Sequence, residues 1–197
     1  MLTVILVAEW LGPARTEAHE LPAEAVLGVM SDTHVSGRGS RRIPSEVLDL
    51  FRRLKVTTIL HAGDLNSPLV LELLEEVAPV IAVHGNSDTV ELRRELPARV
   101  NLTFGAKSLV LIHGDGGTTA DRTAEALCGT TDGVIYGHSH MPRLELVRGT
   151  MLFNPGSPTD KRWWPDYSVG ILRLAGGEFD PSLIVFKDPR DLDRVTQ

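Results

Sequence analysis

Apolar residues form two recurring patterns in the first half of the chain. Short continuous runs predict buried strands, and apolar residues spaced three and four apart predict helices. Pro at a first helical position, as at Pro44 and Pro68, supports two of the helix starts. The predicted elements, alternately strand and helix, are 26–30, 44–54, 57–60, 67–77, 79–83 and 90–95. This alternation is typical of a parallel sheet covered by helices.

The second half of the chain is richer in strand signals. A turn at Gly105 joins two runs as a hairpin, and a helical pattern over 119–127 ends near Gly129. The predicted strands are 100–104, 107–113, 134–137, 144–147, 150–154, 167–174 and 181–186. We therefore expect an α/β fold of two packed sheets with helices outside each, parallel in the first half and largely antiparallel in the second.

A chain of 197 residues and 21.5 kDa, 42% hydrophobic, is in the range of one compact domain. We divide it into an N-terminal extension over 1–24, a core domain over 25–187 and a C-terminal tail over 188–197. The apolar run at 1–8 lacks a preceding Lys or Arg and is too short to span a bilayer, so neither a signal peptide nor a membrane anchor is expected. The extension is interpreted as an added strand or an ordered arm.

The charge and cysteine content narrow the classes of partner. A net charge of −6 and a pI near 5.6 do not favour bulk binding of nucleic acid. Cys128 is the only cysteine, so no intrachain disulfide can form, and the sequence fits a reducing compartment. We predict a cytoplasmic protein.

Five short motifs follow predicted strands and carry Asp, Asn and His. They are SDTH at 31–34, GD at 63–64, GNSD at 85–88, HG at 113–114 and GHSH at 137–140. The candidate metal ligands in them are Asp32, His34, Asp64, Asn86, His113, His138 and His140. Carboxylate, amide and imidazole ligands suit Mn²⁺, Fe²⁺, Ni²⁺ or Zn²⁺, and the absence of cysteine among these ligands argues against a structural zinc site built from thiolates.

The spacing within the motifs favours a site for two ions. In an extended terminus, residues two apart point the same way, so Asp32 and His34 can reach one ion. The carboxylate of Asp64 can bridge two ions that share a water or hydroxide. Taken alone, DxH is a weak signal, GD and NSD are typical of turns, and His113 fits a core histidine, whereas the two histidines of GHSH have little packing rationale. All five motifs at strand ends are hard to explain as separate structural features.

The motif order DxH, GD, GNxD, HG, GHxH resembles the calcineurin-like metallophosphoesterase superfamily. The sequence NPGS at 154–157 and the lack of a cap domain make the chain similar to its small single-domain phosphodiesterase branch. The resemblance implies a four-layer α/β/β/α sandwich of two mixed sheets. It also implies one ion held by Asp32, His34, Asp64 and His140, and a second held by Asp64, Asn86, His113 and His138.

One position departs from the pattern of many superfamily members, which have His after the Asn. That imidazole is credited with contacting the phosphate and protonating the leaving group, but this chain has Ser87. A serine hydroxyl is a poor general acid at neutral pH, so the reaction should favour leaving groups that need little protonation. By analogy, Asp88 orients Asn86 or its loop.

Other residues near the motifs have two interpretations each. Arg38, Arg41 and Arg42 either clamp phosphate oxygens or form a solvated loop, and Ser87 is a further candidate substrate contact. His61 is interpreted as a core histidine, and His84 as a core residue or a spare proton donor. The segment 161–164, KRWW, offers paired tryptophans that stack on a nucleobase or an aryl ester, or pack a subunit contact within a homo-oligomer.

The leading functional hypothesis is a hydrolase, a phosphodiesterase that acts on a small phosphodiester. A metal-bound hydroxide at the dinuclear centre attacks phosphorus, with Asp64, Asn86 and His113 as the catalytic set and Mn²⁺ as the favoured ion. Ni²⁺, Fe²⁺ and Zn²⁺ are the alternatives. A phosphomonoesterase acting on nucleotides or proteins, and a binding module that has lost catalysis, remain as rival functions.

Overall fold

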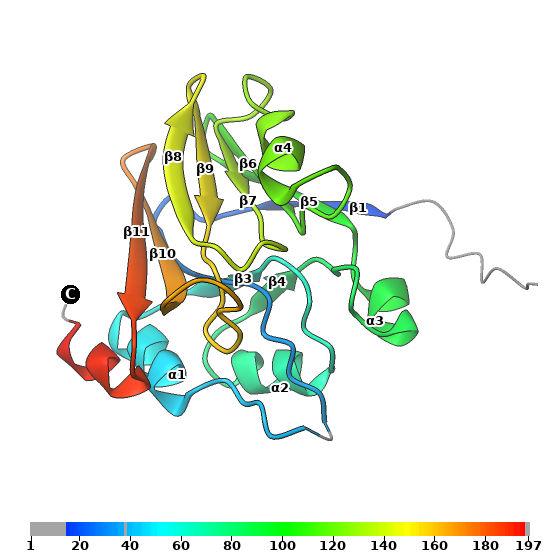
Figure 1. The fold of residues 1–197 in the computed structure, drawn as a ribbon. Helices are drawn as coiled ribbons and strands as arrows, with labels where there is room; N and C mark the ends of the chain where they lie inside the picture. The colour runs from blue at the N-terminus through cyan, green and yellow to red at the C-terminus, as the bar shows by residue number, and fades with distance from the viewer. Residues whose placement is uncertain (1–14, 38, 196–197) are drawn as a thin grey trace, which may run out of the picture.

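The computed structural model describes residues 15–37 and 39–195, which form two mixed β-sheets packed face to face with helices on both outer sides (Figure 1). The five-stranded sheet has the order β11-β10-β2-β3-β4. Its strands are β2 (Ala25–Met30), β3 (Thr58–His61), β4 (Val80–Ala82), β10 (Tyr167–Ala175) and β11 (Glu178–Phe186). The six-stranded sheet has the order β1-β5-β6-β7-β9-β8. Its strands are β1 (Thr16–Glu20), β5 (Arg99–Phe104), β6 (Lys107–Ile112), β7 (Gly133–Ile135), β8 (Arg143–Val147) and β9 (Thr150–Asn154).

Each sheet contains both parallel and antiparallel pairs of strands. In the five-stranded sheet β2, β3 and β4 run parallel, as predicted, and β10 and β11 return from the end of the chain to extend it antiparallel. In the other sheet β6, β7 and β9 run parallel, so the second half is more mixed than its pattern predicts. The helix α4 (Ala120–Glu125) explains part of this, because it forms the crossover that parallel β6 and β7 require.

Three apolar clusters separate four layers, which confirms the predicted sandwich. The clusters follow the alternation of side chains along each strand: Leu27 and Val29 of β2 pack between the sheets, while Met30 packs toward the helices. The outer cluster on that side involves α1 (Ser45–Arg53), α2 (Leu69–Glu75) and α3 (Val90–Glu95). On the opposite side Ala120 and Ala124 of α4 cover the six-stranded sheet.

A glycine in β2 sets how closely α1 approaches its sheet. A Cβ atom on Gly28 would lie 2.8 Å from the ring of Phe51, which is completely buried. Deleting a buried Phe ring costs about 3–5 kcal/mol, so this close contact contributes strongly to the outer layer.

The two ends of the described chain are ordered. β1 lies within the segment interpreted as an extension and pairs parallel with β5, so an added strand is present there; residues 1–14 lie outside the described residues. In the segment interpreted as a tail, the 3₁₀-helix η1 (Pro189–Arg194) buries Leu192, whose carbonyl accepts a 2.6 Å hydrogen bond from Arg53. Within the described residues, no helix has the length and apolar character needed to cross a membrane.

Candidate metal centre

The predicted ligands follow the carboxyl ends of strands from both sheets. Asp32 and His34 come after β2, Asp64 after β3, and Asn86 after β4. His113 follows β6, and the pair His138 and His140 follows β7. These strand ends meet at one edge of the sandwich, so residues more than a hundred positions apart come into contact there.

Most of these residues have an unusual backbone conformation. The φ angle is positive at five of the seven predicted ligands: Asp32 (54°), His34 (46°), Asp64 (59°), His138 (68°) and His140 (60°). A non-glycine residue in this region costs about 1–3 kcal/mol, and such residues cluster at functional sites. The side chains therefore converge through left-handed turns, not through the extended alternation that the sequence analysis assumed.

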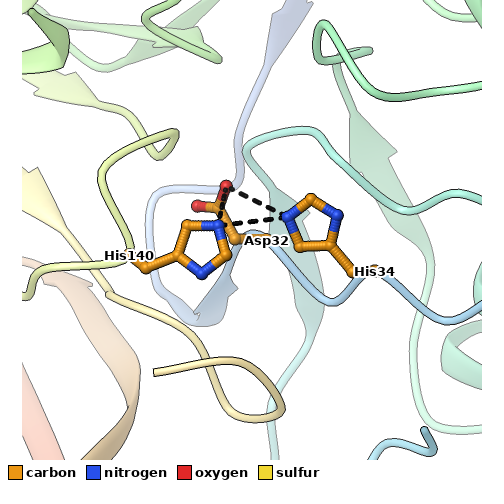
Figure 2. Close-up of side chains that lie close together, drawn as sticks. All are labelled: Asp32, His34 and His140. Carbon is orange, nitrogen blue, oxygen red and sulfur yellow. Dashed lines mark hydrogen bonds and ion pairs between the residues drawn. The ribbon is translucent and has the colours of Figure 1, made fainter. Parts of the chain in front are cut away.

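Asp32, His34 and His140 form the first group of ligand atoms (Figure 2). The Nε2 atoms of the two histidines lie 3.1 Å apart. Asp32 Oδ1 lies 3.3 Å from Nε2 of His140 and 4.0 Å from Nε2 of His34. Two imidazoles and one carboxylate thus point at a common position.

Asp64, Asn86 and His113 lie directly beside the first group. His113 Nε2 is 3.3 Å from Asp64 Oδ2 and 3.2 Å from Asn86 Oδ1. The same Asp64 oxygen is 3.5 Å from His34 Nε2, so it reaches both groups. One ligand atom each of Asp32, Asp64 and His113 lie within 4.8 Å of one another, so Asp32 borders both groups. The resemblance implies a role for Asp32 at one ion only.

His138 lies at the margin of the centre. Its ring meets the ring of His113 edge-on, with centroids 5.1 Å apart, and its backbone N–H donates to Asp32 Oδ2 at 2.9 Å. Neither compact group of ligand atoms includes it. Its Nδ1 is buried and has no hydrogen-bond partner among the described residues, so this nitrogen is available as a ligand atom.

The chemistry of the donor set fits divalent cations. His113 Nδ1 donates to the carbonyl of Ala62 at 2.7 Å, and His140 Nδ1 donates to the carbonyl of Asp160. These bonds fix the ring orientations and direct Nε2 toward the centre, as in metal-binding histidines. Asp32 Oδ1 is buried and accepts no hydrogen bond from the residues that the structure describes. A bound cation would balance the negative charge on this oxygen.

The two groups differ in their electrostatics. Burial raises the pKa of Asp32 to about 7, although His113 opposes the shift. Burial also lowers the pKa of His34 and His140, the latter to about 4, and the nearby charge of Arg162 adds to both shifts. Burial disfavours the charged form of His113 as well, but its hydrogen bonds to Asp64 and Ala62 and the charges of Asp32 and Asp64 together outweigh burial and raise the pKa to about 9.

Asp88 joins the loops that carry Asp64 and Asn86. Its Oδ2 accepts hydrogen bonds from the backbone N–H groups of Asp64 (3.0 Å) and Gly85 (2.7 Å). Its Oδ1 accepts from Asn66 at 2.7 Å. The carboxylate therefore holds two ligand-bearing loops together, which agrees with the orienting role inferred from sequence.

Two glycines allow this close packing. A Cβ atom on Gly85 would lie 2.0 Å from Asp64 Oδ1. A Cβ atom on Gly137 would lie 1.8 Å from Ser31 Oγ and 2.7 Å from Asp32 Oδ2. Any side chain at either position would displace a ligand carboxylate or its neighbour.

The loop after β9 supports the centre from the other side, and sequence reasoning missed most of it. Ser157 Oγ donates to the carbonyl of Asp32 at 2.8 Å, and Thr159 Oγ1 donates to the carbonyl of Thr33 at 2.6 Å. Asp160 contributes through its backbone carbonyl, as described above. The NPGS sequence was the only available signal, because a carbonyl contact leaves no trace in residue type.

The described residues that were predicted to contact substrate interact with other residues of the protein. Arg41 pairs with Asp160 at 3.2 Å, and Arg42 donates to the carbonyls of Gly39 and Arg41 at 2.6 and 2.8 Å. Ser87 Oγ donates to Asn66 Oδ1 at 3.2 Å and lies 3.3 Å from His34 Nδ1. Arg38 lies outside the described residues.

His61 and His84, the two other histidines near the motifs, differ in burial. His61 is completely buried and contacts Thr33 Oγ1 at 3.2 Å, and burial lowers its pKa to about 3. This fits a core histidine. His84 is half-buried, and its Nδ1 has no hydrogen-bond partner among the described residues.

Known proteins resemble this chain in sequence and fold. Residues 26–177 match the family model of the calcineurin-like phosphoesterase superfamily domain. A probable metallophosphoesterase from Methanothermobacter thermautotrophicus is 39% identical over 162 residues, covering 81% of this chain and 91% of the relative. A phosphodiesterase from Methanocaldococcus jannaschii is 26% identical over 142 residues, covering 66% of this chain and 82% of the relative.

Solved structures agree with this relationship at the level of fold. An archaeal phosphodiesterase aligns with a TM-score of 0.65 at 24% identity, covering 82% of this chain and 99% of the other. Vps29 from Entamoeba histolytica, solved in complex with zinc, aligns with a TM-score of 0.62 at 24% identity and the same coverage. Together with the match of the family model and the 39% identical relative, the loops that converge at one edge of a two-sheet sandwich identify the chain as a member of the calcineurin-like phosphoesterase superfamily.

Proposed function

We propose that this metallophosphoesterase-family chain is a phosphodiesterase that holds two divalent ions and hydrolyses a small phosphodiester. The observation that carries the proposal is the position of Asp64 Oδ2, which lies 3.5 Å from His34 Nε2 and 3.3 Å from His113 Nε2. One carboxylate oxygen between two imidazole nitrogens is the arrangement that a shared ligand of two ions requires.

The residues divide between the two ions. Asp32, His34 and His140 would hold one, and Asn86, His113 and His138 the other, with Asp64 common to both. Bound ions would supply Lewis acidity that activates water and stabilises charge on the phosphodiester. The chain itself fixes the histidine rings through Nδ1 and keeps water away from Asp32, which is completely buried.

The preference for diesters rests on position 87. Ser87 Oγ is held between Asn66 and His34, and a serine hydroxyl cannot act as an efficient acid at neutral pH. Diesters with aryl leaving groups need little protonation, whereas alkyl monoesters need it most. Proton donation contributes about 10²–10⁴ in rate, so the lack of a donor would separate these substrates clearly.

The test begins with protein stripped of metal and refilled separately with Mn²⁺, Ni²⁺, Fe²⁺ or Zn²⁺. Each form is assayed on bis(4-nitrophenyl) phosphate and on 4-nitrophenyl phosphate. We expect activity only after refilling, Mn²⁺ as the most effective ion, and faster hydrolysis of the diester. Faster hydrolysis of the monoester would favour the phosphomonoesterase alternative. Full metal loading without turnover of either ester would favour a binding module.

A further inference from the structure

The loop between β9 and β10 presents two side chains from a rigid support. Trp164 N–H donates to the carbonyl of Lys161 at 2.8 Å, which closes a β-turn with Arg162 and Trp163 at its two central positions. The start of the same loop is fixed to the metal-binding loops by Ser157 and Thr159. The turn is therefore held beside the centre and not carried on a loose connection.

Arg162 differs from the other described basic residues of this region. Its side chain is exposed, its φ is 45°, and no described residue pairs with its guanidinium. Arg41 is neutralised by Asp160, and Lys161 Nζ donates to the carbonyl of Pro165 at 2.6 Å. Arg162 lies close to the centre, because its backbone N–H donates to Asp160 Oδ1 at 3.4 Å and the carbonyl of the same Asp160 accepts a hydrogen bond from His140 Nδ1.

The two neighbouring tryptophans have separate environments. Trp163 is 97% exposed, which is unusual for so large an apolar side chain. Trp164 is half-buried, and its indole N–H lies inside the protein without a hydrogen-bond partner among the described residues. The sequence analysis treated the tryptophans as a pair, but only Trp163 offers a free ring face to solvent.

We propose that Arg162 and Trp163 form a recognition arm, in which the guanidinium binds a phosphate oxygen and the indole stacks on an aromatic ester group. The arm rests on the phosphodiesterase function proposed above and narrows its substrate to diesters that carry an aryl or nucleobase-bearing group. A guanidinium forms charge-assisted bonds to phosphate oxygens, and an indole stacks on any base or aryl ring. Adjacent positions in one turn allow both to contact one ligand.

The test compares two esters with the same leaving group, bis(4-nitrophenyl) phosphate and methyl 4-nitrophenyl phosphate. Arg162→Gln should raise KM for both esters about tenfold or more, because it removes the phosphate contact. Trp163→Ala should raise KM about tenfold for the bis-aryl ester only, since stacking is typically worth this much. The value of kcat should change less than twofold, and Trp163→Phe should restore most of the loss.

Matched controls lie on β8 and its turn. Arg148 is also an exposed arginine with positive φ, in the β8–β9 turn, and Leu146 is 72% exposed on β8. Arg148→Gln and Leu146→Ala should leave both KM values unchanged. An unchanged KM in Arg162→Gln, or an equal effect of Trp163→Ala on the two esters, would contradict the proposal that these residues form a recognition arm.

A binding measurement separates failure of the arm from failure of the proposed function. Calorimetry on the Mn²⁺-loaded protein measures the affinities for adenosine 5′-monophosphate and for inorganic phosphate. We expect Trp163→Ala to weaken only the nucleotide about tenfold, and Arg162→Gln to weaken both ligands. This result stands even if wild-type protein hydrolyses neither ester, whereas equal nucleotide binding in all variants would contradict the arm directly.

Discussion

The two halves of the candidate metal centre, one with His34 and His140 and the other with Asn86 and His113, hold their protons differently. His34 and His140 carry lowered pKa values because they are buried, so both are neutral at physiological pH. His113 is as buried as His140, yet its hydrogen bonds to Asp64 and Ala62 and the charges of Asp32 and Asp64 together raise its pKa to about 9. The first half must therefore lose a proton from Asp32, whose pKa is raised to about 7, whereas the second half must lose one from His113, at a higher pH, before Nε2 can coordinate.

The largest expected effect comes from removing the residue that the two halves share. Asp64→Asn should abolish turnover and leave the protein with fewer than two ions per chain, because the side chain reaches both groups. Elemental analysis and a diesterase assay measure this. Asp49→Asn, on the exposed face of α1, is the matched control. Full metal content with a near-normal rate would remove Asp64 from the centre.

The next effect concerns the missing acid at position 87. The rate should fall steeply as the pKa of the leaving group rises, and Ser87→His should flatten this dependence. The gain for poor leaving groups should be about 10²–10⁴, which is the usual contribution of a positioned proton donor. A series of substituted aryl esters measures the slope. An identical slope in both proteins would indicate that another group already donates the proton.

A smaller effect is expected from separating the two ligand loops at Asp88. Asp88→Ala leaves the backbone N–H groups of Asp64, Gly85 and Asn66 without their acceptor. Metal affinity should fall about 10–100-fold, as for other residues that orient ligands. Asp88→Asn keeps one acceptor and should lose less. Metal titration of both variants distinguishes them, and equal affinity to wild type would limit Asp88 to a packing role.

The smallest effect is the pH dependence of the metal-free protein. The folded chain binds a proton at His113 more tightly than the unfolded chain does, so this stabilisation is complete below pH 6.5 and is lost as pH rises through about 9. Asp32 acts in the same direction between about pH 4 and 7. Below about pH 6.5 the histidines of lowered pKa, among them His34, His61 and His140, act in the opposite direction, because they bind protons more tightly in the unfolded chain. The melting temperature should therefore fall between about pH 7 and 9, where these histidines are neutral in both states. His113→Gln should remove the upper part of the decrease, and an unchanged profile would contradict the raised pKa.

The sequence predicts the strand ends well but not how the chain turns beyond them. Apolar runs locate β2, β3, β6 and β7 because buried strands need them, and the polar residues that follow come together as expected. The same runs cannot say which sheet a strand joins, so the return of β10 and β11 to the first sheet was not foreseen. Strand membership depends on long-range packing, which local pattern does not encode.

Ion pairs between side chains could not be predicted from the sequence either. Arg41 and Arg162 look equivalent in the chain, but Asp160 neutralises only Arg41 through a side-chain ion pair. The left-handed turn at Asp32 has no signature either, because an Asp can adopt many conformations. The candidate ligands could be named from sequence, whereas their orientation required the loops to be placed against each other.

The glycines beneath the centre set where this protein can change over evolutionary time. Every substitution at Gly85 or Gly137 would collide with a carboxylate or its immediate neighbour, so neither position has room for a side chain, whatever the substrate. The exposed turn at Arg162 and Trp163 meets no such barrier, since Trp163 is almost entirely in solvent. In the proposed recognition arm, substrate preference would therefore change through two surface residues, without moving any candidate metal ligand.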